Sequence, residues 1–326
     1  MIGELSRRAG RGSVGAVAAA DVAYLSAAMF SGGVTDPRDA CDLIAFDRLV
    51  VAGAHDWAVF FVDAIAAHLL EHTAPAEMVT SEKAEWLAEQ LADPQAQNRN
   101  VDKPRSEASS IAGCMAESPR ALPLLLRLME GARSVAPALP AFALRQVLAA
   151  IITGEGPLSN GRIHFSRVVD THDVALLRRV LTAGGGGEGR AVSRQEADVL
   201  FDIHDATCGA ANDPAFETLF VRAVVQHVRS ASRLHAGSRA SLSMPSADTR
   251  NGAHMALDML ALAGYRPELD SLVETVAVAD EPAAWLTERL SREGRTSPAC
   301  AALVRLLADR AAAMPASLRA LVDRAA

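Results

Sequence analysis

The chain has 326 residues and a formal net charge of −7, and half of its residues are hydrophobic. This length exceeds the usual size of one domain and therefore predicts two. The negative charge argues against a general nucleic-acid-binding protein, which needs a basic face to displace counterions from phosphates. Only 4 % of the residues are aromatic, and alanine supplies much of the apolar content, which favours helices over strands.

The cysteines and the N-terminus bear on the compartment. The four cysteines lie far apart without a CxxC pair: Cys41, Cys114, Cys208 and Cys300. Disulfide-stapled secreted domains are shorter and denser in cysteine, so we expect reduced, mostly buried thiols. Arg7-Arg8 before the apolar stretch Val14–Phe30 resembles an export signal, but Asp21 interrupts that stretch. No apolar run is long enough to span a bilayer, so we expect a cytoplasmic protein without a transmembrane segment.

The first helical unit follows a short N-terminal segment, residues 1–19. A glycine turn at Gly32-Gly33 precedes Asp36-Pro37, a good N-cap followed by proline at the first helical position. Positions 57, 60, 61, 64, 65 and 68 then form a stripe at helical spacing, apolar except for the final His68, which predicts a core-facing helix. A later helix contains Trp86. These signals predict a helical bundle over residues 20–150.

The second unit shows the same signals in the same order after a linker at 151–170. Gly184–Gly189 forms a turn, and Ser193 with Glu196 three residues later is a capping box. The apolar stripe recurs at 216, 219, 220, 223, 224 and 227, and Trp285 and the run Cys300–Leu307 belong to later helices. No segment alternates with a period of two for long enough to predict a sheet.

These parallels predict an internal duplication. Four blocks match in order, beginning at Asp21/Asp173, Asp36/Ser193, Trp57/Phe216 and Trp86/Trp285, and His68 matches His227 at an offset of 159 residues. The offset grows to 199 at Trp86/Trp285, which places an insertion of about forty residues in the second copy. The Ser- and Gly-rich segment Ser230–Gly252 predicts a flexible loop near residues 230–254. The predicted fold is therefore all-α, with two tandem diverged helical bundles over 20–150 and 171–326.

This order of motifs resembles uncharacterised bacterial tandem-repeat proteins whose unit is similar to TerB-like tellurite-resistance folds. The shared pattern is a glycine turn, a capped helix start, a helix such as Trp57–Ala64, and a later helix with an Ala-Trp-Leu or Glu-Trp-Leu core. The resemblance implies small all-helical bundles and a link to metal or envelope stress. Ser291–Thr296 stands where such units often carry an acidic D-x-D-G-like turn, and this chain lacks the aspartates that a calcium site there would need.

The sharpest chemical motif is the H-x-x-E-H string formed by His68, Glu71 and His72. On a helix the two histidines lie one turn apart and could share a zinc ion, with Glu71 as general base. The second copy repeats only the first histidine, and the only third ligand suggested is Glu155. The position of His68 on the apolar stripe favours a histidine at the edge of the core.

Two further patterns have simpler interpretations. The run Gly184–Gly187 lacks the Lys-Ser/Thr of a phosphate-binding loop, so we interpret it as a turn between helices. Asp198, Asp202 and Asp205 share one helix face near His204 and could hold a cation, but a solvated face is the favoured interpretation. No Ser-His-Asp or Cys-His pairing can be assigned from the sequence.

The sequence therefore favours a non-catalytic helical interaction or regulatory module with a protein partner and no cofactor. The alternative is a zinc-dependent hydrolase that uses His68, Glu71 and His72. The three tryptophans and Phe216 are expected to be core anchors rather than ligand platforms.

Overall fold

The computed structural model describes residues 17–50, 55–92, 118, 120–153, 167–183, 191–240, 278–292, 297–310, 314–316 and 318–320. Within these ranges the fold is predominantly α-helical, as the composition predicts. The chain divides into two compact units: Met1–Arg167 with Arg179–Gly186, and Val168–Arg178 with Gly187–Ala326.

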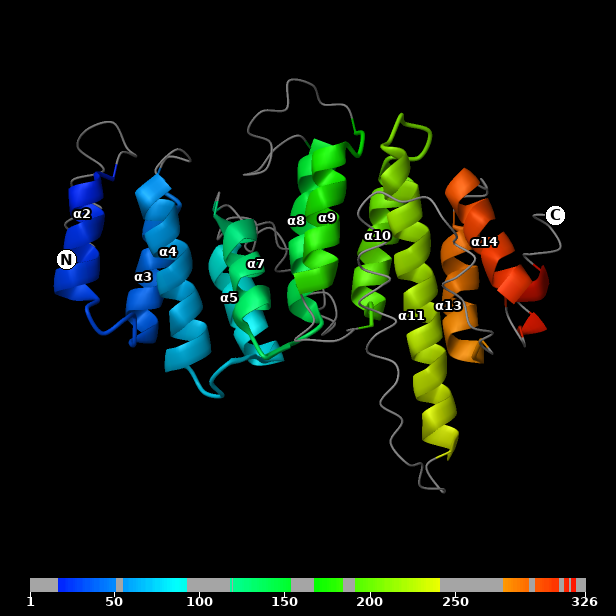
Figure 1. Ribbon diagram of the computed structural model, residues 1–326, viewed down its shortest axis with the longest axis horizontal. Helices are drawn as coiled ribbons and strands as arrows, with labels where there is room; N and C mark the ends of the chain where they lie inside the picture. Colours follow the sequence, from blue (N-terminus) through cyan, green and yellow to red (C-terminus); the bar gives the residue numbers. More distant parts are fainter. Residues whose placement is uncertain are drawn as a thin grey trace, which may run out of the picture. The chain divides into compact units, whose positions relative to one another are not determined.

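The first unit packs its helices side by side (Figure 1). They are α2 (Ala19–Tyr24), the π-helical turn η1 (Leu25–Met29), α3 (Pro37–Asp47), α4 (His55–Ala67), the π-helical turn η2 (His68–His72), α5 (Ser81–Leu91), α7 (Ala121–Gly131) and α8 (Ala138–Thr153). Helix α4 packs against α2, α3 and α7, and α8 packs against α5 and α7. Helix α4 therefore lies between α2 on one side and the rest of the bundle on the other.

The second unit is built from α9 (Thr171–Ala183), α10 (Arg194–Ala206), α11 (Pro214–Ala240), α13 (Asp280–Ser291) and α14 (Pro298–Arg310). The last residues of α9, from Arg179, group with the first unit. Helix α11 packs against α10, α13 and α14. Helix α11 therefore lies at the centre of the packing in this unit.

The predicted helix starts are confirmed. The Asp36 carboxylate accepts a hydrogen bond from the Arg38 amide at 2.8 Å, with Pro37 at the first helical position of α3. Ser193 and Glu196 exchange the two hydrogen bonds of a capping box at the start of α10. Each cap satisfies amide groups that have no partner within the helix, which is why these local signals are readable from sequence.

One small sheet interrupts the helices of the first unit. Strands β1 (Met78–Val79) and β2 (Ser134–Val135) form a single parallel pair. The turn before β1 is held by the buried Lys83, whose ammonium donates to the carbonyls of Leu69, Thr73, Pro75 and Met78 at 2.6–2.9 Å. Burial lowers the pKa of Lys83. The four carbonyls supply the acceptors that a buried ammonium requires.

The core anchors differ from the prediction at one position. Trp57, Phe216 and Trp285 are buried, but Trp86 is only partly buried, and the neighbouring Leu87 fills the core instead. The apolar residues of α5 at 84, 87, 88 and 91 lie on the buried face, and Trp86 lies beside it. The prediction of a fully buried Trp86 is therefore wrong, because sequence matching to Trp285 does not fix the rotation of the helix.

The prediction of a flexible loop from Ser230 is wrong for residues 230–240, which are helical. Helix α11 continues to Ala240, and the buried Ser232 hydroxyl accepts a hydrogen bond from the Ala279 amide at 3.1 Å. Alanine and arginine, which recur in this stretch, are good helix formers and extend the helix past the first serines. Residues 241–254 of the predicted insertion lie outside the described residues.

Matching histidines occupy corresponding places in the two units. His68 Nδ1 lies 2.7 Å from the Val34 carbonyl oxygen, and His227 Nδ1 lies 2.9 Å from the Val192 carbonyl oxygen. Both valines stand just before the N-cap of a helix, α3 or α10. Each histidine also faces the tryptophan of the later helix, Trp86 or Trp285, with ring centroids 6.1 Å and 4.8 Å apart. These parallel contacts are what a duplication predicts.

Candidate functional site

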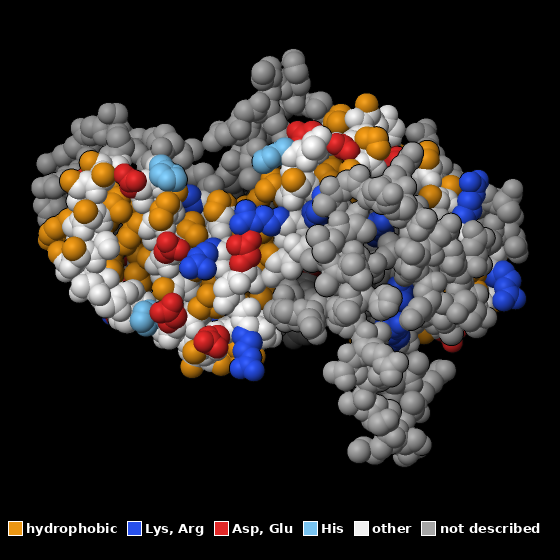
Figure 2. All heavy atoms as spheres, in the orientation of Figure 1, with side chains coloured by type: hydrophobic (Ala, Val, Ile, Leu, Met, Phe, Trp, Pro, Cys, Tyr) orange, Lys and Arg blue, Asp and Glu red, His pale blue; other side chains and the backbone are white. Residues whose placement is uncertain are grey.

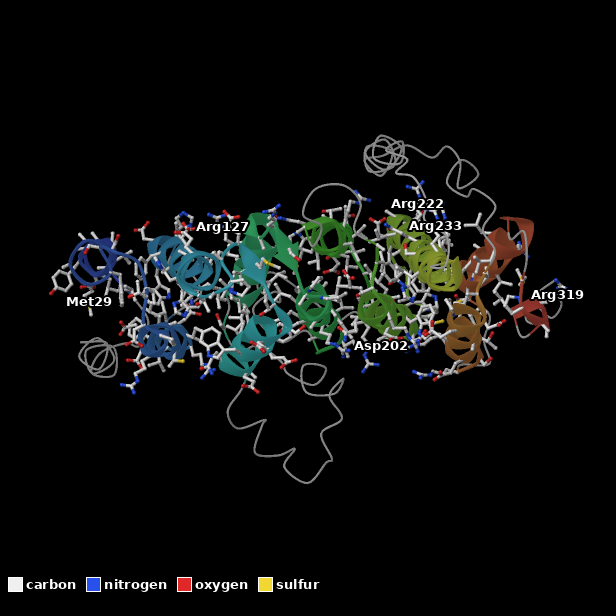
Figure 3. The ribbon with its side chains drawn as sticks, turned by 90° about the horizontal axis from the view of Figure 1, so that it is seen from below. Met29, Arg127, Asp202, Arg222, Arg233 and Arg319 are labelled. Atoms are coloured by element: carbon white, nitrogen blue, oxygen red, sulfur yellow. The ribbon has the colours of Figure 1, made fainter. Side chains whose placement is uncertain are left out.

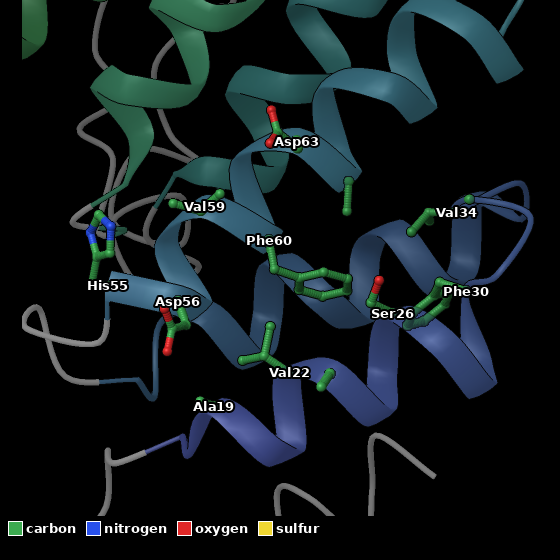
Figure 4. A pocket seen from close by; sticks show the side chains of 13 residues that line it. Ala19, Val22, Ser26, Phe30, Val34, His55, Asp56, Val59, Phe60 and Asp63 are labelled. Carbon is green, nitrogen blue, oxygen red and sulfur yellow. The ribbon is translucent and has the colours of Figure 1, made fainter.

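An open groove of about 810 Å³ lies between α2–η1 and α4 of the first unit. One wall comes from Ala19, Val22, Ala23, Ser26 and Phe30 of α2–η1 and the turn that follows. The facing wall comes from α4, where the lining residues are His55, Asp56, Val59, Phe60, Asp63 and Ala64. Figure 4 shows Phe60 extending from α4 toward the α2–η1 wall, where Val22, Ser26 and Phe30 lie.

The α2–η1 wall has a low profile because small side chains recur at 19, 23 and 26, about one helical turn apart. Most of this segment is exposed, and Leu25 is its one buried residue. A π-helical turn is uncommon and often marks a functional position, and η1 contributes Ser26 to the groove. The wall therefore presents backbone and small side chains to whatever enters the groove.

The α4 wall adds larger apolar groups. Val59 is 50 % exposed, and Phe60 is partly buried against Trp57 and Phe30, with ring centroids 5.7 Å and 6.3 Å apart. The sequence placed Phe60 and Ala64 on the core stripe, but they line the groove. The signal for this was the continuous apolar run from Trp57 to Val62, which is wider than a single core-facing stripe requires.

Acidic groups flank the apolar surface. Asp56 is exposed at the start of α4, and Asp63 lies two helical turns further along the same helix. Asp63 accepts from Arg127 Nε at 3.2 Å at the surface of the unit, where Figure 3 labels Arg127. Among the described residues no hydrogen bond or ion pair engages the Asp56 carboxylate. On the face drawn in Figure 2, hydrophobic side chains gather over the α2–α4 end of the first unit, with acidic groups among them.

The H-x-x-E-H residues lie just beyond this groove, in η2. His68 is buried and bound to the Val34 carbonyl, whereas Glu71 and His72 are exposed. The His72 ring covers Gly33, whose left-handed φ of 83° and lack of a side chain permit that close approach. Within the described residues, no group of three or more His, Cys, Asp or Glu side chains is arranged to hold a metal. Glu155 and the glycine run at 184–189 lie outside the described residues.

The acidic cluster of α10 is neutralised by the protein itself. Arg289 donates to Asp198 and Asp202 at 2.6–2.9 Å, and Trp285 Nε1 donates to Asp198 at 2.9 Å. Asp205 instead lies 3.1 Å from His204 Nδ1. Asp198 and Asp202 therefore share the guanidinium of Arg289, whereas Asp205 lies against His204, so the three carboxylates do not gather around one metal ion.

The second unit contains a buried polar chain that sequence reasoning missed. His204 Nε2 lies 2.8 Å from Ser297 Oγ and 4.0 Å from Cys300 Sγ, and its ring stacks on Phe220. Burial lowers the pKa of His204, but Asp205 and Cys300 outweigh burial and raise the pKa to about 10. The order Asp205, His204, Ser297 is that of an activated serine, but Ser297 Oγ also accepts from the Cys300 amide and thereby caps α14.

The first unit has a counterpart without histidine. The buried Asp47 carboxylate accepts from Trp57 Nε1 at 2.7 Å and from the Ser118 hydroxyl, and pairs with Arg120 at 3.1 Å. Burial raises the pKa of Asp47, against opposing effects of Ser118, Trp57 and Arg120. Ser118 Oγ accepts from the amide of Arg120, the N-cap residue of α7, whereas Ser297 Oγ accepts from the Cys300 amide within the first turn of α14. The shared feature is a buried serine near the start of a later helix that contacts a side chain of an earlier part of the chain, which favours a structural role in both units.

Comparisons with known proteins return no match: no family model, no curated protein and no solved structure is similar to this chain. Among the described residues, no helix is long and apolar enough to cross a membrane. Of the described cysteines, Cys300 is buried, Cys41 is partly buried and Cys208 is exposed.

Proposed function

We propose that this protein is a non-catalytic helical interaction module of the cytoplasm, and that the groove between α2–η1 and α4 receives a segment of a protein partner. The observation that carries the proposal is the groove itself, an open space of about 810 Å³ between α2–η1 and α4 that is lined mostly by apolar residues. An exposed apolar surface lined by polar groups is typical of interaction sites, because soluble proteins otherwise bury such surface.

The neighbouring surface supports the same proposal. Tyr24 of α2 is 53 % exposed and Val59 of α4 is 50 % exposed. Alanine and serine at 19, 23 and 26 leave space for the backbone of a partner to approach. The resemblance to TerB-like tandem proteins adds the proposal that the two units are copies and that the module acts in a stress response.

The contacts of the H-x-x-E-H residues lend no support to the alternative of a zinc-dependent hydrolase. His68 Nδ1 is committed to a backbone carbonyl, and His72 lies over Gly33. A catalytic zinc site needs three protein ligands around one point. The described residues give His68 the geometry of a structural histidine that fixes the start of α3.

A groove-filling substitution tests the proposed function. The probe is a neutral amphipathic peptide of about 14 residues, long enough to follow the groove at 1.5 Å per helical residue, with leucine and alanine on one face and glutamine elsewhere. We expect it to bind the wild-type chain, and Ala23→Trp to weaken binding by about tenfold or more because the indole occupies the groove. Fluorescence anisotropy of the labelled peptide measures the affinity.

The matched control is Ala20→Trp, which places the same side chain on the same helix outside the groove lining. It should leave the affinity within about twofold of wild type, less than about 0.5 kcal/mol. Equal loss in both variants would show that α2 is merely disturbed. Absence of peptide binding to the wild-type chain would refute the proposed function.

A further inference from the structure

We infer that the occupant of the groove is an amphipathic helix of a partner protein that carries a basic side chain facing Asp56. This inference rests on the proposed function and names its ligand class. It follows from three features of the groove: the shape of its walls, the position of its charges, and the charge of the whole chain.

The walls favour a helix over an extended strand. Both walls are helices, and the lining residues of the α2–η1 wall run from Ala19 to Phe30, a length of about 18 Å at 1.5 Å per residue. A third helix can place its apolar ridge between two helices, whereas an added strand needs a free sheet edge. The β1–β2 pair contributes no residue to the groove. About three turns of partner helix fit this length.

The charges select a basic partner. Asp56 lies in the groove lining with an exposed carboxylate that no described residue engages, and Asp63 lies seven residues along the same wall. Arg127 already pairs with Asp63, so Asp56 is the carboxylate that can accept a new cation. Asp56 lies in the first turn of α4, where its negative charge also stabilises the helix. Its side chain is exposed and can therefore pair with a cation of a partner.

The same charges disfavour anionic ligands. A nucleic acid or an anionic lipid surface would bring negative charge against Asp56 and Asp63, and the chain carries a net charge of −7. Complementary charge mainly sets specificity and association rate, while the apolar surface supplies affinity. The partner helix therefore needs an apolar face with lysine or arginine along its flank.

The test compares three peptides that share the apolar face of the neutral probe and carry lysine, glutamine or glutamate on the flanks. We expect the lysine peptide to bind wild type about tenfold more tightly than the glutamate peptide at low salt, and this preference to shrink at high salt. Asp56→Asn should reduce the preference to about threefold or less, chiefly by weakening binding of the lysine peptide. Asp42→Asn is the control, since Asp42 is exposed on α3 outside the groove.

The outcomes separate the inference from the proposed function. Equal binding of lysine and glutamate peptides, both blocked by Ala23→Trp, would overturn the inference and leave the proposed function standing. A wild-type dimer that Ala23→Trp converts to a monomer would identify a second copy as the occupant and overturn the inference. Binding that appears only after deletion of residues 1–16, which contain Arg7, Arg8 and Arg11, would identify that segment as the occupant and also overturn it.

Discussion

Each of the two units ties a buried serine near the start of a late helix to an earlier helix, but through chemically different groups. In the first unit the link is a carboxylate with an arginine, Asp47 and Arg120, both almost fully buried. In the second unit the residue 157 positions after Asp47 is His204, and the residue two positions after the capping Ser297 is Ala299 where the first unit has Arg120. The offset of 157 is the one that relates the N-caps Asp36 and Ser193.

The two units therefore hold a buried serine with groups of different charge. A buried carboxylate needs a compensating cation, and the first unit supplies Arg120. A histidine can be buried with a hydroxyl and a neighbouring carboxylate, so the second unit needs no arginine at that place. If the units are copies, as proposed, the two residues that Asp47 and Arg120 represent in the first unit both differ in the second, where His204 and Ala299 stand. Three sets of measurements test how the stabilising contacts of the two units differ.

Removing the arginine of the first unit should have the largest effect. Arg120→Met leaves the Asp47 carboxylate buried without its cation, and breaking a buried pair in this way costs about 3–5 kcal/mol. Denaturant unfolding of the full chain measures the loss. Arg127→Met is the control because its pair with Asp63 is exposed on both sides and should contribute less than about 1 kcal/mol. Losses of similar size in the two variants would contradict the described burial.

The next comparison is between the losses of stability caused by truncating Trp285 and Trp86. Trp285 is 3 % exposed and donates to Asp198, so Trp285→Ala should cost about 3–5 kcal/mol of unfolding free energy. Trp86 is only partly buried, so Trp86→Ala should cost less. Thermal melts of the two variants rank them. A greater loss for Trp86→Ala would show that the burial of the two helices is assigned the wrong way round.

The third comparison concerns the opposite pH dependence of two histidines in the second unit. The raised pKa of His204 means that its stabilising contribution is complete below about pH 6.5, the usual histidine value, and is lost as pH rises toward about 10. Burial and Arg194 lower the pKa of His227, against opposing effects of the Val192 carbonyl, Asp198 and Glu281. Its contribution is therefore complete above about pH 6.5 and is lost as pH falls through the lowered value.

His204→Gln and His227→Gln should accordingly change the pH profile of stability in opposite directions. Relative to wild type, we expect His204→Gln to be most destabilising at low pH and His227→Gln to be most destabilising at high pH. Unfolding free energies at about pH 5, 7 and 9 in matched ionic strength give the comparison. Parallel profiles for the two variants would refute the assigned environments.

The sequence by itself determined the helical class, the capped starts at Asp36 and Ser193, and the buried faces around Trp57 and Phe216. These features depend on local propensity and on spacing within a few turns, which a single sequence displays directly. It also paired His68 with His227, whose matching carbonyl contacts the structure describes. The duplication and the resemblance to TerB-like units stay predictions that these contacts support.

Tertiary structure alone decided which distant side chains meet. Asp47 reaches Ser118, and His204 reaches Ser297, across 71 and 93 residues of sequence. Tertiary packing also determines that Trp86 is only partly buried, that α11 extends to Ala240, and that Phe60 and Val59 line an open groove. Helical periodicity shows that a face is apolar but not what covers it, because coverage depends on how neighbouring helices pack. The groove exists because α2–η1 covers α4 only in part, which no local pattern in the sequence records.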